Sequence, residues 1–350
     1  MTTAAKRWMR RVRAPLEVAG IKLGMAIVPR LPRRVLLGLA RSFGTLGYVF
    51  SPSLRRLGFA NLDVAFGSTL SPREKRTILK RSMRNFSLVL LDLFWFSRHA
   101  RERMERYVQV APSLVRLEEA TGPVVGLTAH YGNWEMAGRR FGMTKRGLMS
   151  VAMPVKNATA GRLLQQAREC TGQCIVERQG ALKKLIRHLR ANGTVGLLLD
   201  QNTKPSEGGI FVHFFGKPAT ISPAAGSLAL ATGADIVFAH FLPDANGHYL
   251  GEAPRWITAA EIAALPRADA IAILSQRIAG FYEEAIRLHP DYWLWSYKRW
   301  RYIPDGTPAA GFPSYAQPVP APPGKDSAVD PSPRPVASSP SPTPKETPHA

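Results

Sequence analysis

The sequence predicts an α/β protein with a mostly parallel central sheet flanked by helices. Five short, mostly apolar runs have the length of strands that are buried on both faces. They are Val124–Ala129, Met149–Met153, Cys174–Glu177, Val195–Asp200 and Ile236–Leu242. Helical patterns fall between and after them: Trp134–Phe141, Gly161–Thr171, Ala181–Ala191, Pro223–Thr232 and Ala268–Leu288. This alternation favours a parallel sheet, in which ligands gather at the carboxyl ends of the strands.

Three regions differ in composition. Residues 1–110 are basic and read as helical, residues 111–303 form the α/β core, and residues 304–350 are Pro-rich and predict a disordered tail. Two apolar stretches in the first region, Leu16–Pro29 and Val35–Phe50, are separated by Arg30, Arg33 and Arg34, and each is shorter than the ~18 residues of a membrane span. The mixture predicts an N-terminal helical region that associates with a membrane at its interface. An ordinary packing helix with a basic face is the alternative.

The charge of the chain points to an anionic partner. Lys and Arg number 47 against 25 Asp and Glu, which leaves +22. Nucleic acid, an acidic leaflet, a phosphorylated lipid or an acidic carrier protein would each fit. We expect no nucleic acid, because the basic residues are spread and no nucleic-acid-binding module appears. The two cysteines, Cys170 and Cys174, lack a second ligand pair for zinc, so we expect two buried thiols and no metal or cofactor.

The run His130-Tyr131-Gly132-Asn133-Trp134-Glu135 follows the first predicted strand. On one helix, residues five apart point ~140° away from each other, so the His and the Glu can meet only if the backbone turns between them. Gly132 permits an unusual backbone conformation and Asn133 can cap the next helix. We expect Glu135 to accept the Nδ1 proton and leave Nε2 as a general base. Backbone N–H groups near Gly132 and Asn133 would meet an oxyanion. The alternative is a polar loop with a solvated Glu135.

Further polar residues follow other strands. Asp200 and Gln201 end a second strand at the same predicted edge. Arg168 could hold a phosphate or pair with an acidic side chain. Lys217 follows Phe214 and Phe215, which could line an apolar slot or belong to the core. Arg299 lies in the aromatic run 293–300, which fits a membrane interface, a phosphorylated headgroup or a packed core.

In this order the motifs resemble the bacterial lipid A biosynthesis late acyltransferases (lauroyl/myristoyl type) of the lysophospholipid acyltransferase superfamily. The resemblance covers roughly residues 10–303. It implies a catalytic H-x4-[DE] dyad at His130 and Glu135, and further essential polar residues that we place at Arg168 and Asp200. We also expect Asn133, Gln201, Lys217 and Arg299 to bind substrate. An N-terminal membrane anchor is implied as well.

The resemblance implies transfer of a fatty acyl chain from an acyl-carrier-protein or acyl-CoA thioester to a hydroxyl of a lipid A precursor. His130 would be the general base, with Glu135 orienting it. No serine or cysteine stands in a nucleophile context, so no acyl-enzyme is expected. The expected partners are the thioester donor, a phosphorylated glycolipid acceptor and an anionic membrane surface, at the cytoplasmic face of the bacterial inner membrane. The alternative is acylation of a lysophospholipid or another glycolipid by the same dyad, with a basic nucleic-acid-binding protein as a remote one.

Overall fold

The computed structural model describes residues 3–153 and 155–319, and the surroundings of side chains from Ala14 onward. Within this part, seven strands form one sheet in the order β1-β9-β8-β2-β5-β3-β4. Neighbouring strands are parallel, except that β8 and β9 are antiparallel. The α/β class and the mostly parallel sheet are therefore confirmed. The bounds are β1 Val108–Val110, β2 Val124–Thr128, β3 Leu148–Ala152, β4 Cys174–Glu177, β5 Thr194–Leu198, β8 Asp235–Pro243 and β9 Tyr249–Ile257.

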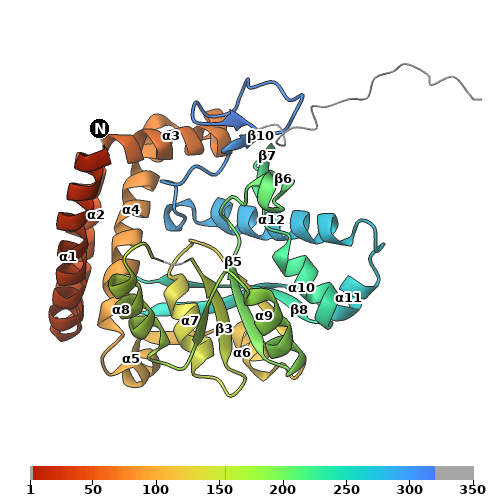
Figure 1. Cartoon of the computed structure of the whole chain (residues 1–350), viewed down its shortest axis with the longest axis horizontal. Helices are drawn as coiled ribbons and strands as arrows, with labels where there is room; N and C mark the ends of the chain where they lie inside the picture. The colour runs from red at the N-terminus through yellow and green to blue at the C-terminus, as the bar shows by residue number, and fades with distance from the viewer. Residues whose placement is uncertain (1–2, 154, 320–350) are drawn as a thin grey trace, which may run out of the picture. The chain divides into compact units, whose positions relative to one another are not determined.

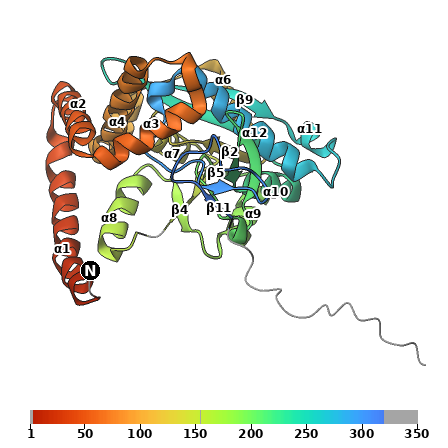
Figure 2. The same ribbon diagram turned by 90° about the horizontal axis from the view of Figure 1, so that it is seen from above.

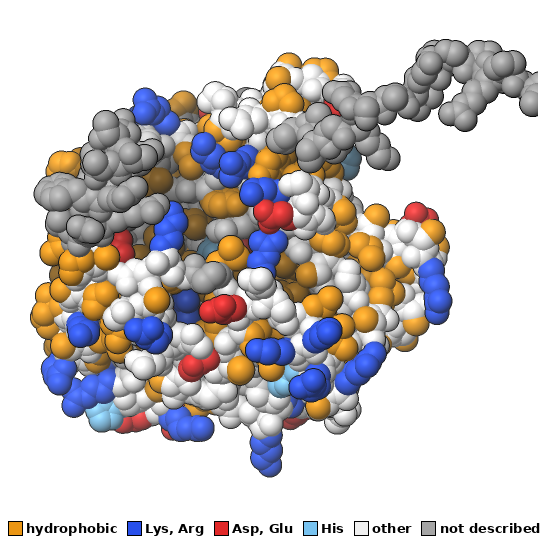
Figure 3. Space-filling model, in the orientation of Figure 1, with side chains coloured by type: hydrophobic (Ala, Val, Ile, Leu, Met, Phe, Trp, Pro, Cys, Tyr) orange, Lys and Arg blue, Asp and Glu red, His pale blue; other side chains and the backbone are white. Residues whose placement is uncertain are grey.

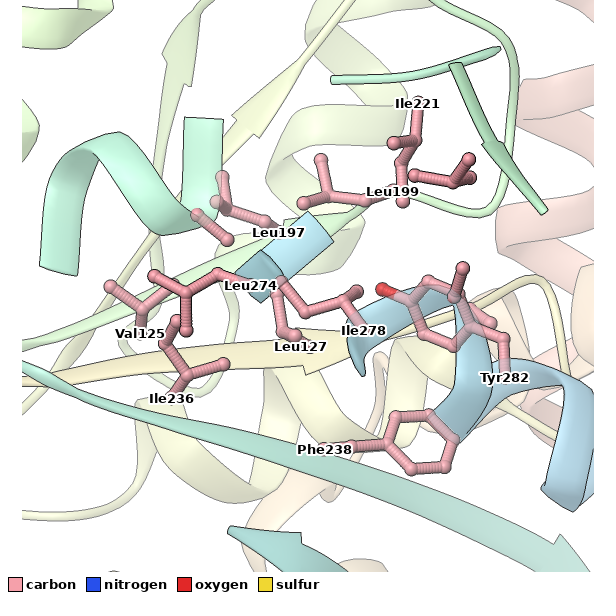
Figure 4. Close-up of a cluster of buried hydrophobic side chains, with 14 of the residues drawn as sticks. Val125, Leu127, Leu197, Leu199, Ile221, Ile236, Phe238, Leu274, Ile278 and Tyr282 are labelled. Carbon is pink, nitrogen blue, oxygen red and sulfur yellow. The ribbon is translucent and has the colours of Figure 1, made fainter. Parts of the chain in front are cut away.

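One face of the sheet packs against three helices. These are α9 (Ala181–Arg190), α10 (Ala224–Thr232) and α12 (Ala270–Leu288), with the short α11 (Ala259–Ala263) beside them. Successive strand residues alternate between the two faces of a sheet, and one set here meets side chains of α12. Figure 4 shows this core; it contains Val125, Leu127, Leu197, Ile236, Phe238, Leu274, Ile278 and Tyr282.

The opposite face packs against α6 (Pro112–Glu119) and α7 (Trp134–Gly142). Behind them lie α4 (Pro72–Trp95) and α5 (Ala100–Tyr107), whose buried side chains join the same core. The helix α8 (Ala158–Glu169) contacts α7 and β4. Cys170 and Cys174, which follow α8, are exposed, so the expectation that they are buried is wrong.

A two-stranded hairpin was absent from the predicted elements. It consists of β6 (Ile210–Phe214) and β7 (Lys217–Ile221) and packs on α12. Its residues Phe214 and Phe215 contact the buried Trp293 and Trp300, so both aromatic runs belong to the core. The predicted tail starts too early, because β11 (Gln317–Pro318) pairs with β10 (Tyr302–Ile303). Residues 320–350 lie outside the described part.

Helices make up the N-terminal region. α1 (Thr3–Ile27), α2 (Arg33–Phe50) and α3 (Pro52–Phe66) precede α4, and α2 packs along α4 (Figures 1 and 2). A capping box of Ser71 and Glu74 fixes the start of α4, since each side chain accepts a hydrogen bond from the other's backbone N–H. In the described part of the chain, every helix is too short or too polar to cross a membrane.

Candidate active site

His130 lies in the tight turn between β2 and α7, at the carboxyl edge of the sheet. Gly132 has φ +60°, and a Cβ atom there would lie 2.3 Å from the carbonyl oxygen of Phe241, so glycine is required on both counts. The Gly132 N–H donates to Tyr292 O at 3.0 Å, and the Asn133 N–H donates to Phe241 O at 2.8 Å. Both N–H groups are therefore occupied, and the predicted oxyanion site at these two positions is wrong.

Asp200 is the partner of the His130 ring. Its Oδ1 lies 2.9 Å from Nδ1, and its Oδ2 accepts the backbone N–H of His130 at 3.0 Å. The indole N–H of Trp293 donates to the same Oδ2 at 2.9 Å. The register of the sheet explains the contact, since β2 and β5 pair Thr128 with Leu198, and two more residues along each strand bring position 130 beside position 200.

The pKa values of this pair reflect their mutual attraction. Burial would lower the pKa of His130, but the Asp200 carboxylate and its hydrogen bond outweigh burial and raise that pKa above its ordinary 6.5. Burial would raise the pKa of Asp200, and the imidazole together with the hydrogen bond from Trp293 lowers it instead. A carboxylate on Nδ1 holds the proton there, which leaves the Nε2 lone pair for a reacting proton.

Glu135 does not contact Nδ1, so the predicted hydrogen bond from His130 to Glu135 is wrong. Its carboxylate is bound by Arg168, whose Nε donates to both oxygens at 3.0 Å and whose Nη2 donates to Oε1 at 2.8 Å. The first turn of α7 directs Glu135 toward the end of α8, where Arg168 lies. Of the two predictions for Arg168, the pairing with an acidic side chain is confirmed.

Arg139 was not singled out in the sequence. It is fully buried on α7, and it donates to Leu93 O, Phe96 O and Ala167 O. These carbonyls lie at the carboxyl ends of α4 and α8, where helix carbonyls lack intrahelical partners. Arg139 thus fixes the helix that carries Glu135 against the helix that carries Arg168. In the sequence, the only feature that could have pointed to Arg139 is its position four residues after Glu135 on the same predicted helix.

A cavity of about 480 Å³ opens beside His130, between the sheet, α7 and α8. Four of its polar lining residues lie near His130: Thr128, Glu135, Arg168 and Gln201. The lining also contains Ser150, Gln173 and Thr194. The other end is apolar and is lined by Leu117, Phe141 and Leu148, with Thr194 beside them. In the middle, Gly126 and Gly196 lie side by side on neighbouring strands, and their lack of side chains leaves the cavity open.

Of four residues predicted to bind substrate, one lines the cavity and three lie outside its lining. Gln201 lines the cavity, with its Nε2 3.4 Å from His130 Nε2. Asn133 is buried and donates to the Tyr249 hydroxyl at 2.9 Å, outside the cavity lining. Lys217 lies over the Phe312 ring, and Arg299 is buried over Phe214 with its pKa lowered to about 10 by burial. The described surroundings of Asn133, Lys217 and Arg299 therefore give them no contact with this cavity.

Comparison with known proteins shows the family of the chain. A family model described as bacterial lipid A biosynthesis acyltransferase matches residues 6–302. The chain belongs to this family. It is also 23% identical over 293 residues to the lipid A biosynthesis lauroyltransferase of Escherichia coli (strain K12), across 81% of this chain and 90% of that protein. This acyltransferase therefore carries out acyl transfer in lipid A biosynthesis.

Proposed function

We propose that the protein transfers a fatty acyl chain from a thioester to a hydroxyl of a lipid A precursor, with His130 as general base and Asp200 as the residue that orients it. The observation that carries the proposal is the His130–Asp200 pair at the polar end of an apolar cavity. An acyl chain fits such a cavity, and its reactive carbon would then lie beside Nε2. Membership of the family supplies the chemistry of transfer.

In the proposed reaction one group, the His130 imidazole, accepts a proton and later returns it. Nε2 of His130 takes the hydroxyl proton while the hydroxyl oxygen attacks the thioester carbonyl. The new C–O bond gives a tetrahedral oxyanion, and the imidazolium is stabilised by Asp200. When the oxyanion collapses, the C–S bond breaks and the imidazolium returns its proton to the departing sulfur. The enzyme forms no covalent bond with the acyl group.

Arg168 is the group best suited to the oxyanion. Its Nε and Nη2 are held by Glu135, which fixes the guanidinium plane and leaves Nη1 for another acceptor. Arg168 lines the cavity near His130. A charged donor that is fixed before the reaction stabilises developing charge without reorganisation. Glu135 then acts by positioning Arg168, and its charge also helps to raise the pKa of His130.

The cavity favours an extended chain that runs along the strands. From Leu198 to Thr194, which both line the cavity, the strand β5 advances roughly 13 Å, at about 3.3 Å per residue. A fully extended polypeptide advances up to about 3.6 Å per residue over three backbone bonds, which is roughly 1.2 Å per bond. We take the same advance per bond for an extended acyl chain. About ten or eleven bonds therefore fit above β5. Phe141, Leu148 and Leu117 would contact the methyl end.

The N-terminal helices support docking at a membrane interface. Exposed apolar side chains line α1 and α2: Leu16, Leu23, Ile27, Val35, Phe43, Leu46, Val49 and Phe50. Hydrophobic side chains gather at the same edge of the molecule in Figure 3. Arg34 and Arg41 are exposed on the flank of α2, where they would meet anionic headgroups. We place the enzyme at the cytoplasmic face of the bacterial inner membrane, with a phosphorylated glycolipid as acceptor and an acyl-carrier-protein or acyl-CoA thioester as donor.

The test is transfer by the purified full chain from a defined acyl thioester to a lipid A precursor and, separately, to a lysophospholipid. We expect the lipid A precursor to be the better acceptor. His130→Ala should lower the rate by about 10²–10⁴-fold, which is the usual contribution of a general base. Transfer to the lysophospholipid alone would replace the acceptor proposed here. Wild-type activity in His130→Ala would remove His130 from the mechanism.

A further inference from the structure

The helix α9 carries a row of exposed cations on the side away from the core. Its inner residues Ala181, Leu185 and Leu189 are buried, and its outer residues Lys183, Lys184, Arg187 and Arg190 are exposed. Positions 183, 187 and 190 are four and three residues apart, so these side chains share one face. Residues 178–199 contain five Lys or Arg and no Asp or Glu. The outer face of α9 is therefore uniformly positive.

These charges are not used within the described fold. Within the described ranges, none of the four α9 cations forms an ion pair with another residue. The nearby Glu207 is already bound by Arg178 and Lys204. Figure 3 shows Lys and Arg side chains gathered where α9 lies in Figure 1. A row of unpaired cations raises self-repulsion, so it fits a surface that meets an anionic partner.

The row begins next to the opening of the active-site cavity. Arg178, the first residue after β4, lies with its Nη1 4.0 Å from the sulfur of Met153. Met153 lines the cavity and is 66% exposed, so it stands at the opening. The helix α9 starts three residues after Arg178, and Ala181 N–H donates to its carbonyl. A partner on α9 would thus lie beside the opening through which a thioester must enter.

The shape of the row selects the class of partner. Lys183 and Arg190 are about 10 Å apart along the helix, at 1.5 Å per residue. Their side chains stand on the convex face of a helix, whereas a free phosphate or a nucleotide is usually held in a concave site. Leu182 is 59% exposed at the edge of the row and offers apolar contact. The helices α1 and α2, which carry the exposed apolar side chains, lie on a different side of the molecule from α9 in both ribbon views (Figures 1 and 2). This placement argues against a membrane at α9.

We propose that the outer face of α9 is the docking surface for an acidic protein that carries the acyl chain as a thioester. The proposal rests on the proposed function and names the form of its donor. Complementary charge on the carrier would align the thioester with the cavity opening and speed association. The contribution is to donor binding, so the residues of α9 are not catalytic.

The experiment compares two donors that bear the same acyl chain, one on an acidic acyl carrier protein and one on pantetheine, which has no charge. In the full chain, Lys183→Glu, Arg187→Glu and Arg190→Glu together should raise KM for the carrier donor at least tenfold. The kcat with that donor, and kcat/KM with acyl-pantetheine, should stay within twofold of wild type. The control variant reverses the charge of three exposed arginines outside α9, through Arg73→Glu, Arg76→Glu and Arg98→Glu. It should leave KM and kcat for both donors unchanged.

Several results would overturn this inference. An unchanged KM for the carrier donor in the α9 variant would do so, as would an equal rise in the control variant. Loss of binding to anionic vesicles with KM unchanged would assign the row to a membrane. If the α9 variant loses activity with acyl-pantetheine, the neutral set Lys183→Gln, Arg187→Gln and Arg190→Gln is tested, and an unchanged KM there rejects the proposal. Wild-type enzyme that transfers from neither donor would instead reject the proposed function.

Discussion

His130 and Asp200 are 70 residues apart in the chain, yet two hydrogen bonds join them, one to the ring Nδ1 and one to the backbone N–H. Asp200 therefore fixes both the orientation of the imidazole and the end of the strand that carries it. Its side chain is only 2% exposed, so no water competes for the carboxylate. The acid that matters most for His130 comes from the neighbouring strand and not from the adjoining helix.

Replacement of Asp200 by Asn should change both the orientation of the His130 ring and the pKa of His130, and the two effects can be measured separately. The base must be neutral, so the rate of wild type should fall as pH drops through a pKa above the ordinary 6.5 of histidine. In Asp200→Asn the burial that lowers the pKa of His130 is no longer opposed by the Asp200 carboxylate, and the inflection of kcat/KM should move to lower pH. We expect kcat to fall about 10⁴-fold, as in the triad enzymes, where the analogous change favours the wrong tautomer. A pH–rate profile measures both effects, and an inflection that stays in place would contradict the role of Asp200.

The Arg168–Glu135 pair should matter to both stability and rate. Arg168→Gln leaves Glu135, with 8% of its side chain exposed, without its cation, and we expect a loss of about 1–3 kcal/mol in the free energy of unfolding. If Arg168 meets the oxyanion, kcat should also fall about 10²–10³-fold. The double variant Glu135→Gln with Arg168→Gln removes the unpaired charge. It should regain stability in urea unfolding without regaining rate, and recovery of both would limit the pair to a structural role.

How much of this site can be predicted from the sequence depends on the kind of contact. The strands, and the placement of His130 at a strand end beside a turn at Gly132, follow from apolar runs and the special conformation of glycine. The choice between Asp200 and Glu135 as partner depends on the order and register of β2 and β5, which strand patterns do not contain. The places of Lys217 and Arg299 could not be predicted either. The sequence pattern of a cation beside aromatic residues is the same in a packed core and at a ligand site.

Gly126 should set how far an acyl chain enters the cavity. A Cβ atom there would be 3.6 Å from its nearest neighbour, which is ordinary contact, so Gly126→Val should fold and fill the cavity midway. Longer acyl donors should lose at least tenfold in kcat/KM relative to shorter ones, since each methylene is worth ~1–3 kcal/mol in such a site. Gly122→Val, in the loop before β2 where a Cβ atom meets nothing within 4 Å, is the matched control. An unaltered chain-length profile in Gly126→Val would mean that the acyl chain lies elsewhere.

The exposed apolar residues of α2 should decide whether the protein binds lipid surfaces. Phe43 and Leu46 are each 50% exposed and lie about one turn apart on the outer face of α2. Burying each in the interface would contribute up to about 1.5–3 kcal/mol, so Phe43→Asp with Leu46→Asp should lower partitioning to anionic vesicles at least tenfold. Leu230→Asp removes a leucine that is 40% exposed on α10, which lies on the other side of the molecule from α1 and α2 (Figures 1 and 2), and should leave partitioning unchanged. Sedimentation with vesicles measures each variant, and equal partitioning of all three proteins would contradict docking through α2.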